Sequence, residues 1–220
     1  MAITWPAPLQ HQVKVLLDNF LIDPPALIGA ASVDDLRRAH LMRPARIEPL
    51  SGYAQSRAFV LVTNADNQPQ LWVDPDDNSY RDIYRLFART RLGVTAALDG
   101  DTYNFDHMFP RTAGALDGLS HVRMIAIAPR PNQSAGRTLE KRMAQRARTV
   151  AGGKVLRSAT WMTIGKAAGF EGWESLPGED AVANQAVVAA LFAHLASIGI
   201  TPPAGALEHG LTAGTLGKIR

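Results

Sequence analysis

Two adjacent ionisable residues, Asp106 and His107, lie in the stretch YNFDHMFPR among aromatic and apolar neighbours. A plain core strand would have apolar residues at both positions, so we expect this pair to do chemistry. A carboxylate is a hard ligand suited to Mg²⁺ or Mn²⁺, and histidine, which titrates near neutral pH, can take a proton from water. Because side chains alternate along a strand, the two groups can act on either side of a bound substrate.

Asn132 and a basic tract follow the Asp-His pair. Between Arg130 and Arg157 the only acidic residue is Glu140. Such clustering creates a local positive field that attracts polyanions, and it is clustered charge, rather than the net charge of +3, that indicates nucleic-acid binding. The alternative interpretation is a solvated helix face. The basic residues of the tract are Arg130, Arg137, Lys141, Arg142, Arg146, Arg148, Lys154 and Arg157.

The order of these residues resembles the HNH, or ββα-metal, family of nucleases. The motif of that family runs Asp-His, a hydrophobic pair and Pro, then a loop with Gly and Asp, an apolar strand, and an Asn or His ahead of a basic helix. The segments FDHMFPRTAGALDGLSHVRMIAI and NQSAGRTLEKR fit this layout, and the resemblance covers residues 103–148. It implies metal-dependent hydrolysis of phosphodiester bonds.

The resemblance implies a role for each matching position. Asp106 and Asn132 would hold one Mg²⁺ or Mn²⁺ ion per active site, and His107 would be the general base. His121 departs from the pattern, because the family usually has an Asn there that holds the catalytic His. We expect His121 to do this work through a hydrogen bond to a backbone group, or to join the metal ligands. The residues expected to bind nucleic acid are Arg111, Arg130, Arg137, Lys141 and Arg142.

Hydrophobic periodicity predicts the elements that must position these residues. We expect a short extended segment at 103–108, a strand at 121–128 and a helix at 134–148. Further predicted elements are helices at 8–21 and 32–42, a hairpin whose strands contain 59–62 and 71–73, a helix at 79–93, a short helix at 159–170 and a buried helix at 181–199.

These elements predict an α+β protein with a ββα-metal core, mostly helical flanking regions and an N-terminal β-hairpin. The expected organisation is a helical and hairpin region at 1–98, a nuclease core at 99–157 and a helical region at 158–220 packed on the core. The alternative is that all three regions form one domain.

Composition excludes several classes of protein. A chain that is 46% hydrophobic and 20% charged is typical of a globular protein that buries a core. The lack of cysteine excludes disulfides, thiolate zinc sites and cysteine nucleophiles. No apolar run is long enough to span a bilayer and the first residues lack the layout of a signal peptide. We therefore expect a cytoplasmic protein, or one delivered into another cell, without a membrane partner.

The segment WVDPDDNSY carries enough acidic residues to suggest a second cation site. Asp74, Asp76, Asp77 and Asn78 are also the residue types that form turns and cap helices. Because a predicted helix follows directly, we interpret the segment as a turn and a cap.

The leading hypothesis is a metal-dependent nuclease. DNA is favoured over RNA as the substrate because the resembled family mostly cuts DNA. The settings that fit are an antibacterial toxin or effector, a defence nuclease, or a phage or mobile-element nuclease. A toxin would need an immunity protein, and an acidic one would suit the basic tract. The alternative is a non-catalytic nucleic-acid-binding protein that keeps a degenerate HNH scaffold, with His121 marking the loss of the motif.

Overall fold

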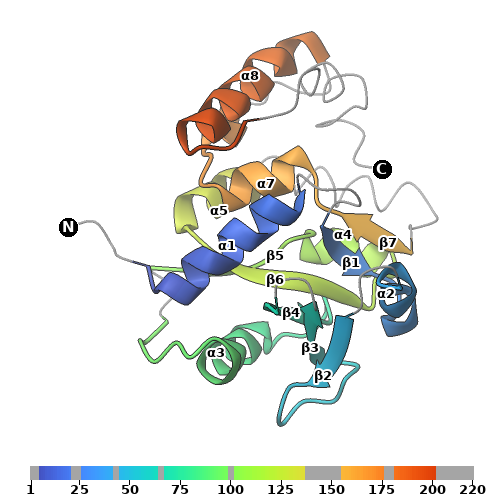
Figure 1. The fold of residues 1–220 in the computed structure, drawn as a ribbon. Coiled ribbons are helices and arrows are strands. Elements are labelled where there is room, and N and C mark those ends of the chain that lie inside the picture. Colours follow the sequence, from blue (N-terminus) through green and yellow to red (C-terminus); the bar gives the residue numbers. More distant parts are fainter. Residues whose placement is uncertain are drawn as a thin grey trace.

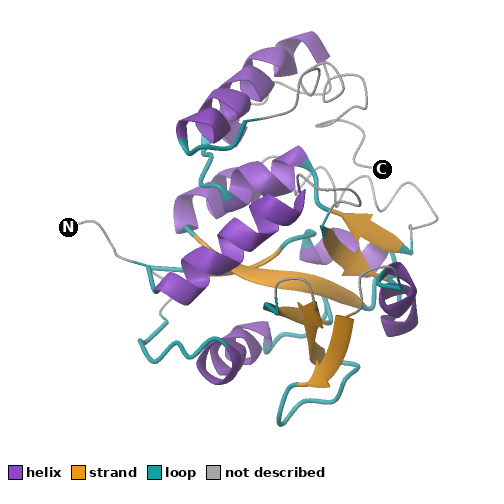
Figure 2. Cartoon of the chain, in the orientation of Figure 1, coloured by secondary structure: helices purple, strands orange, loops and turns teal. Residues whose placement is uncertain are grey.

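The structure of the chain is a computed structural model that describes residues 5–20, 26–41, 45–63, 67–98, 102–136, 155–175 and 181–201. Within these residues, helices lie on both sides of one curled sheet (Figures 1 and 2). The mixed α and β class predicted from the sequence is therefore confirmed.

The sheet has seven strands, and all of its strand pairs are antiparallel. Its main path has the order β2-β3-β4-β6-β1-β7, and β5 pairs with β6 beside that path. The sheet thus joins strands from the expected regions 1–98 and 99–157, and β7 ends at the first residue of the expected region 158–220. The strands are β1 (Leu27–Ala30), β2 (Ala45–Pro49), β3 (Ala58–Thr63), β4 (Pro69–Val73), β5 (Asn104–His107), β6 (His121–Ile127) and β7 (Leu156–Ser158).

Strand β6 is the centre of the sheet, and every one of its residues is buried. Val122 pairs with Gly29 of β1 and with Val73 of β4, while Met124 pairs with β4 and with His107 of β5. A strand residue has one partner on each edge, so β4 occupies one edge of β6. Strands β1 and β5 must share the other edge, end to end.

The helices surround this sheet. Helix α3 covers one face, whereas α1, α5 and α7 lie on the other (Figure 1). The helices are α1 (Ala7–Phe20), α2 (Val33–Ala39), α3 (Tyr80–Arg91), α4 (Arg111–Leu116), α5 (Pro129–Ala135), α7 (Trp161–Ala167) and α8 (Ala181–Ser197), with a 3₁₀ turn, η2 (Gly172–Ser175).

Several predicted elements are confirmed, together with their local causes. The side chain of Ser32 caps α2 by accepting a hydrogen bond from the Asp35 backbone N–H at 3.0 Å. The predicted hairpin is the β3–β4 pair. Helix α3 follows the predicted amphipathic pattern with Ile83 and Phe87 buried, and Gly93, at φ +68°, ends the segment in a conformation that favours glycine.

Two main apolar clusters lie on the two faces of the sheet. One joins α3, through Tyr84 and Phe87, to residues of β3, β4, β5 and β6. The other joins β6 to α7 and α8, through residues that include Ile164 and Leu191. Strand β5 lies between these clusters, and this position determines where the two side chains of the Asp-His pair go.

The N-terminal flanking region contains more strands than predicted, whereas the described elements after β7 are helical, as expected. Strand β1 has only four residues, too few for an alternating pattern to distinguish a strand from a helix. Strand β2 is an edge strand with charged side chains, among them Arg46 and Glu48, as edge strands commonly are. The segment between β5 and β6, expected as a loop, contains α4. The predicted helix at 134–148 begins earlier, at Pro129, and its residues 137–148 lie outside the described residues.

Candidate active site

Asp106 and His107 are on β5, paired with the central strand. Asp106 lies opposite Ile125, which belongs to the cluster with α7 and α8. His107 lies opposite Met124, which belongs to the cluster with α3. Because directly opposed residues of an antiparallel pair share a face, Asp106 and His107 project from opposite faces of the sheet, as strand alternation predicts.

Asp106 forms a buried ion pair with Lys166 of α7. The Lys166 Nζ lies 2.6 Å from the Asp106 Oδ2, and the two side chains are 4% and 10% exposed. A charge buried this deeply is tolerated only with a partner of opposite sign. The carboxylate predicted to bind a cation is therefore already next to one, supplied by the chain itself.

His107 is also buried, at 6% exposure, against the ring of Tyr80 at a centroid distance of 4.9 Å. Its Nε2 has no hydrogen-bond partner among the described residues. Burial, together with the positive charges of Arg111 and Lys166, lowers the pKa of His107 from 6.5 to about 3. The imidazole is therefore neutral at physiological pH, with a nitrogen available to a ligand or a water.

Asn132, the second predicted metal ligand, lies half-buried on α5 directly after β6. Helix α5 packs against β5 and α7, so it lies on the side of the sheet to which Asp106 points. Within the described ranges, no three His, Asp or Glu side chains converge as a metal site would require. Any cation here would rest on Asp106, the Asn132 amide oxygen and water.

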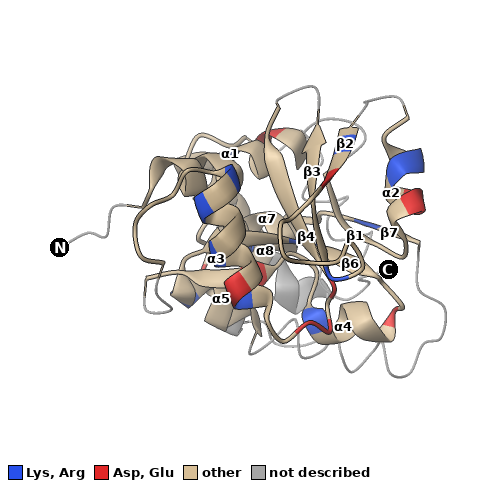
Figure 3. Ribbon diagram, turned by 90° about the horizontal axis from the view of Figure 1, so that it is seen from below, with Lys and Arg blue, Asp and Glu red and all other residues tan. Residues whose placement is uncertain are grey.

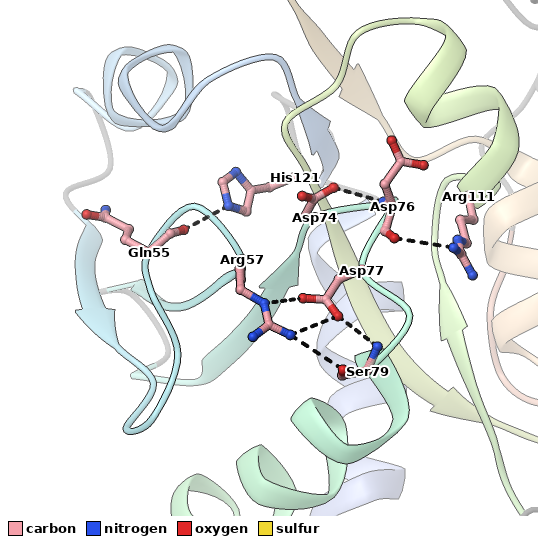
Figure 4. A network of polar contacts seen from close by, with 8 residues as sticks. All are labelled: Gln55, Arg57, Asp74, Asp76, Asp77, Ser79, Arg111 and His121. Carbon is pink, nitrogen blue, oxygen red and sulfur yellow. Dashed lines mark hydrogen bonds and ion pairs between the residues drawn. The ribbon is translucent and has the colours of Figure 1, made fainter.

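His121 is placed away from His107. It lies on β6, three residues from the partner of His107 and on the opposite face of the sheet. Its Nε2 is 2.9 Å from the backbone carbonyl of Gln55 (Figure 4), and its Nδ1 is 2.9 Å from the Ser120 hydroxyl. The expected hydrogen bond to a backbone group exists, but it holds the segment between β2 and β3.

Arg111, expected to bind phosphate, holds the acidic segment after β4. Its guanidinium donates to the Pro75 carbonyl and to the Asn78 side-chain oxygen, both at 2.7 Å. It also donates to the Asp76 carbonyl at 3.4 Å (Figure 4). Its charge lies 5.9 Å from the Tyr80 ring that packs on His107. Arg111 therefore links the acidic segment to the surroundings of His107.

The acidic segment is a turn, as predicted, rather than a cluster open to a cation. Asp74 accepts a hydrogen bond from the Asp76 backbone N–H at 2.8 Å, and Asp77 accepts one from that of Ser79 at 2.7 Å. Arg57 donates two hydrogen bonds to Asp77 and holds the pKa of this carboxyl below its usual value. The cap at the start of α3 comes from Asp77, whereas the Ser79 side chain makes no capping bond.

The structure describes the basic tract only at its two ends, residues 130–136 and 155–157. Arg130 is exposed on α5, whereas Arg157 is buried on β7 and forms an ion pair with Asp117. The predicted contacts Arg137, Lys141 and Arg142 lie outside the described residues. Basic and acidic residues are mixed on α2 (Figure 3), where Arg37 forms an ion pair with Asp34.

Lys166 is the site residue that the sequence did not reveal. It stands in ATWMTIGKAAGF, a short helix whose other residues are apolar or small. The usable signal was a single lysine inside an apolar helix, because a buried ammonium needs a carboxylate from elsewhere in the chain.

Comparisons of the chain with protein-family models, with curated proteins and with solved structures gave no match. In the part of the chain that the structure describes, no helix combines the length and the apolar character needed to cross a membrane.

Proposed function

We propose that this chain is a metal-dependent nuclease that hydrolyses the phosphodiester bonds of nucleic acid, DNA in preference to RNA. The main support for the proposal is the state of His107. This histidine is buried and neutral, its Nε2 has no hydrogen-bond partner among the described residues, and it is next to the carboxylate of Asp106. An unsatisfied buried nitrogen costs free energy, so its presence calls for an explanation, and a catalytic role supplies one.

The arrangement of the elements supports the same proposal. Strands β5 and β6 are an antiparallel pair, and α5 follows β6 and packs on β5. This is the order of a ββα-metal unit, with α4 inserted in the connection between its strands. Under this proposal the unit is embedded in a larger sheet and uses β4 and β1 as supports.

The donor chemistry of the site fits one hard cation. Asp106 faces the layer that contains α5, and it already has a positive charge beside it, the ammonium of Lys166. Asp106 and Asn132 would hold Mg²⁺ or Mn²⁺, with water in the remaining positions. When bound, the ion would supply positive charge to the phosphate and to the leaving oxygen.

His107 would act as the general base. Its neutral imidazole can accept a proton from water at Nε2 while the water oxygen attacks phosphorus, and the bond from phosphorus to the leaving sugar oxygen breaks, with that oxygen taking up a proton from solvent. Because His107 is 6% exposed, nucleic acid reaches it only when the residues around Tyr80 move. Arg111 and Arg130, with Arg137, Lys141 and Arg142 of the basic tract, would bind the sugar-phosphate backbone.

Incubation with supercoiled plasmid tests the proposal. With Mg²⁺ or Mn²⁺ we expect nicked and linear DNA, and no product in EDTA. The His107→Ala variant should lose activity by about 10²-fold to 10⁴-fold, whereas His11→Ala, at an exposed histidine of α1, should cut as fast as the parent. Cleavage that persists at the full rate in His107→Ala would refute the assignment of the base.

A second candidate function is favoured by the Asp106–Lys166 pair. A carboxylate neutralised by a buried lysine is what a ββα scaffold would have if it bound nucleic acid without cutting it. The plasmid experiment separates the two functions when retention on the DNA is measured alongside. Binding without nicking under any metal would exclude the nuclease and support the scaffold.

The nuclease proposal also suggests a biological setting. A nuclease with a basic tract and few other recognisable modules fits an antibacterial toxin or effector, or a defence enzyme. If it is a toxin, its immunity protein should be acidic, because the basic tract would attract such a partner. Co-expression with an acidic neighbouring gene product should then suppress plasmid nicking and form a complex on gel filtration.

A further inference from the structure

We propose that Lys166 competes with a divalent cation for Asp106, so that the lysine closes the metal site while no metal is bound. This inference rests on the proposed function in one respect, the assignment of Asp106 as a metal ligand. It goes beyond that function because it assigns the site a built-in regulatory group on a different element of the fold.

The charges at the site favour only one occupant at a time. Lys166 Nζ is within 2.6 Å of the Asp106 carboxylate and both side chains are nearly excluded from water. Two cations on one buried carboxylate would repel each other in a medium that screens charge poorly. Entry of a divalent ion therefore requires the ammonium to leave.

The backbone under Lys166 is firmly held. A capping box between Thr160 and Thr163 begins α7, and Gly165 packs so closely against Leu191 and Trp173 that a Cβ there would lie within 2.7 Å of both side chains. The helix itself is therefore a poor candidate for movement. The lysine side chain has four rotatable methylene groups, so its ammonium can swing away while α7 stays in place.

Binding of Mn²⁺, measured without any nucleic acid, tests the inference. The free ion is followed by electron paramagnetic resonance in titrations of the parent, Lys166→Gln, and the double variant Asp106→Asn with Lys166→Gln. We expect Lys166→Gln to bind Mn²⁺ at least about tenfold more tightly than the parent. The double variant should lose this gain, because it lacks the carboxylate.

The outcomes are distinct. If Lys166→Gln binds Mn²⁺ no better than the parent, or if the double variant keeps the gain, the inference is overturned. If Lys166→Gln unfolds in the absence of metal, a rise of its melting temperature with Mn²⁺, missing in the double variant, supports the inference, and the lack of any rise overturns it. Because no step involves DNA, a chain that gains Mn²⁺ affinity but never nicks plasmid would refute only the nuclease function.

Discussion

Lys166 on α7 and Asp106 on β5 lie about sixty positions apart in the sequence, yet their charged atoms are 2.6 Å apart in the interior of the protein. The ion pair joins helix α7 to strand β5 in a layer whose buried side chains are mostly apolar. Burial of this kind makes the two residues energetically dependent on each other.

We predict a strong coupling between the two residues in stability. In metal-free buffer, Asp106→Leu or Lys166→Met alone should lower the free energy of unfolding by about 3–5 kcal/mol, because each leaves a buried charge without its partner. The double variant should recover most of this loss, since both charges are gone. Urea denaturation of the four proteins measures the effect, and additive losses in the double variant would contradict it.

Asp77 should contribute more to the stability of the fold than an exposed residue of an acidic turn would. It accepts hydrogen bonds from Arg57 and from the Ser79 backbone N–H at the start of α3, so Asp77→Ala should cost about 2 kcal/mol. Asp77→Asn keeps an oxygen for Ser79 and should cost less. The control is Asp82→Ala, which removes an exposed pair with Arg85 and should cost below about 1 kcal/mol. Equal melting temperatures for the two alanine variants would refute the prediction.

Gly165 should be intolerant of a side chain. A Cβ there would lie 2.6 Å from Leu191 Cδ1 and 2.7 Å from Trp173 Cζ2, so Gly165→Ala should destabilise the protein by about 1–3 kcal/mol. The matched control is Gly114→Ala in α4, where the nearest atom would be 3.3 Å away. We expect Gly114→Ala to lose less stability in denaturant titration than Gly165→Ala does. An equal loss in the two variants would contradict the close packing of Gly165 against Leu191 and Trp173.

Acid should destabilise the fold partly through His121. Burial lowers the pKa of this histidine, against the opposing effect of its hydrogen bond to Gln55. As the pH falls, the unfolded chain therefore binds the proton of His121 at a higher pH than the folded chain does. The contribution of His121 to the free energy of unfolding is fully present above about pH 6.5 and is lost as the pH drops below that value. One such group contributes up to about 1.4 kcal/mol per pH unit.

His121→Gln, which cannot titrate, tests this prediction. Its free energy of unfolding should fall less steeply than that of the parent between pH 6.5 and lower values, as measured by denaturant titration at each pH. His107 has a lowered pKa in both proteins, so its contribution cancels in the comparison. If the free energies of unfolding of the two proteins fall in parallel with pH, His121 does not cause the loss of stability in acid.

The sequence predicted those elements whose pattern is local. The hairpin β3–β4 and helix α3 have clear periodicity, Ser32 is a recognisable cap, and the acidic turn has the residue types of a turn. The opposite orientations of Asp106 and His107 also followed from strand alternation alone. These features depend on residues a few positions apart, so a local sequence pattern is enough to predict them.

Long-range pairing could not be predicted. Strand β1, with four residues, and the short strand β7 are strands because they pair with each other and β1 pairs with β6. Likewise, the sequence did not predict the ion pair of Asp106 with Lys166, because no local pattern connects residues that are so far apart in the chain. His121 was weighed as a partner of His107, but its face of the sheet and its contact with Gln55 depend on how the whole sheet assembles.

The position of β6 has a consequence for how the protein assembles and opens. This strand pairs with β4 on one edge and with β1 and β5 on the other, and these partners come from before it in the chain. Its backbone amides should therefore exchange with deuterium only through global unfolding, whereas those of the edge strand β2 should exchange through local fraying. Because β6 must find strands many residues upstream, its docking is expected to be a late, slow event that limits the rate of folding.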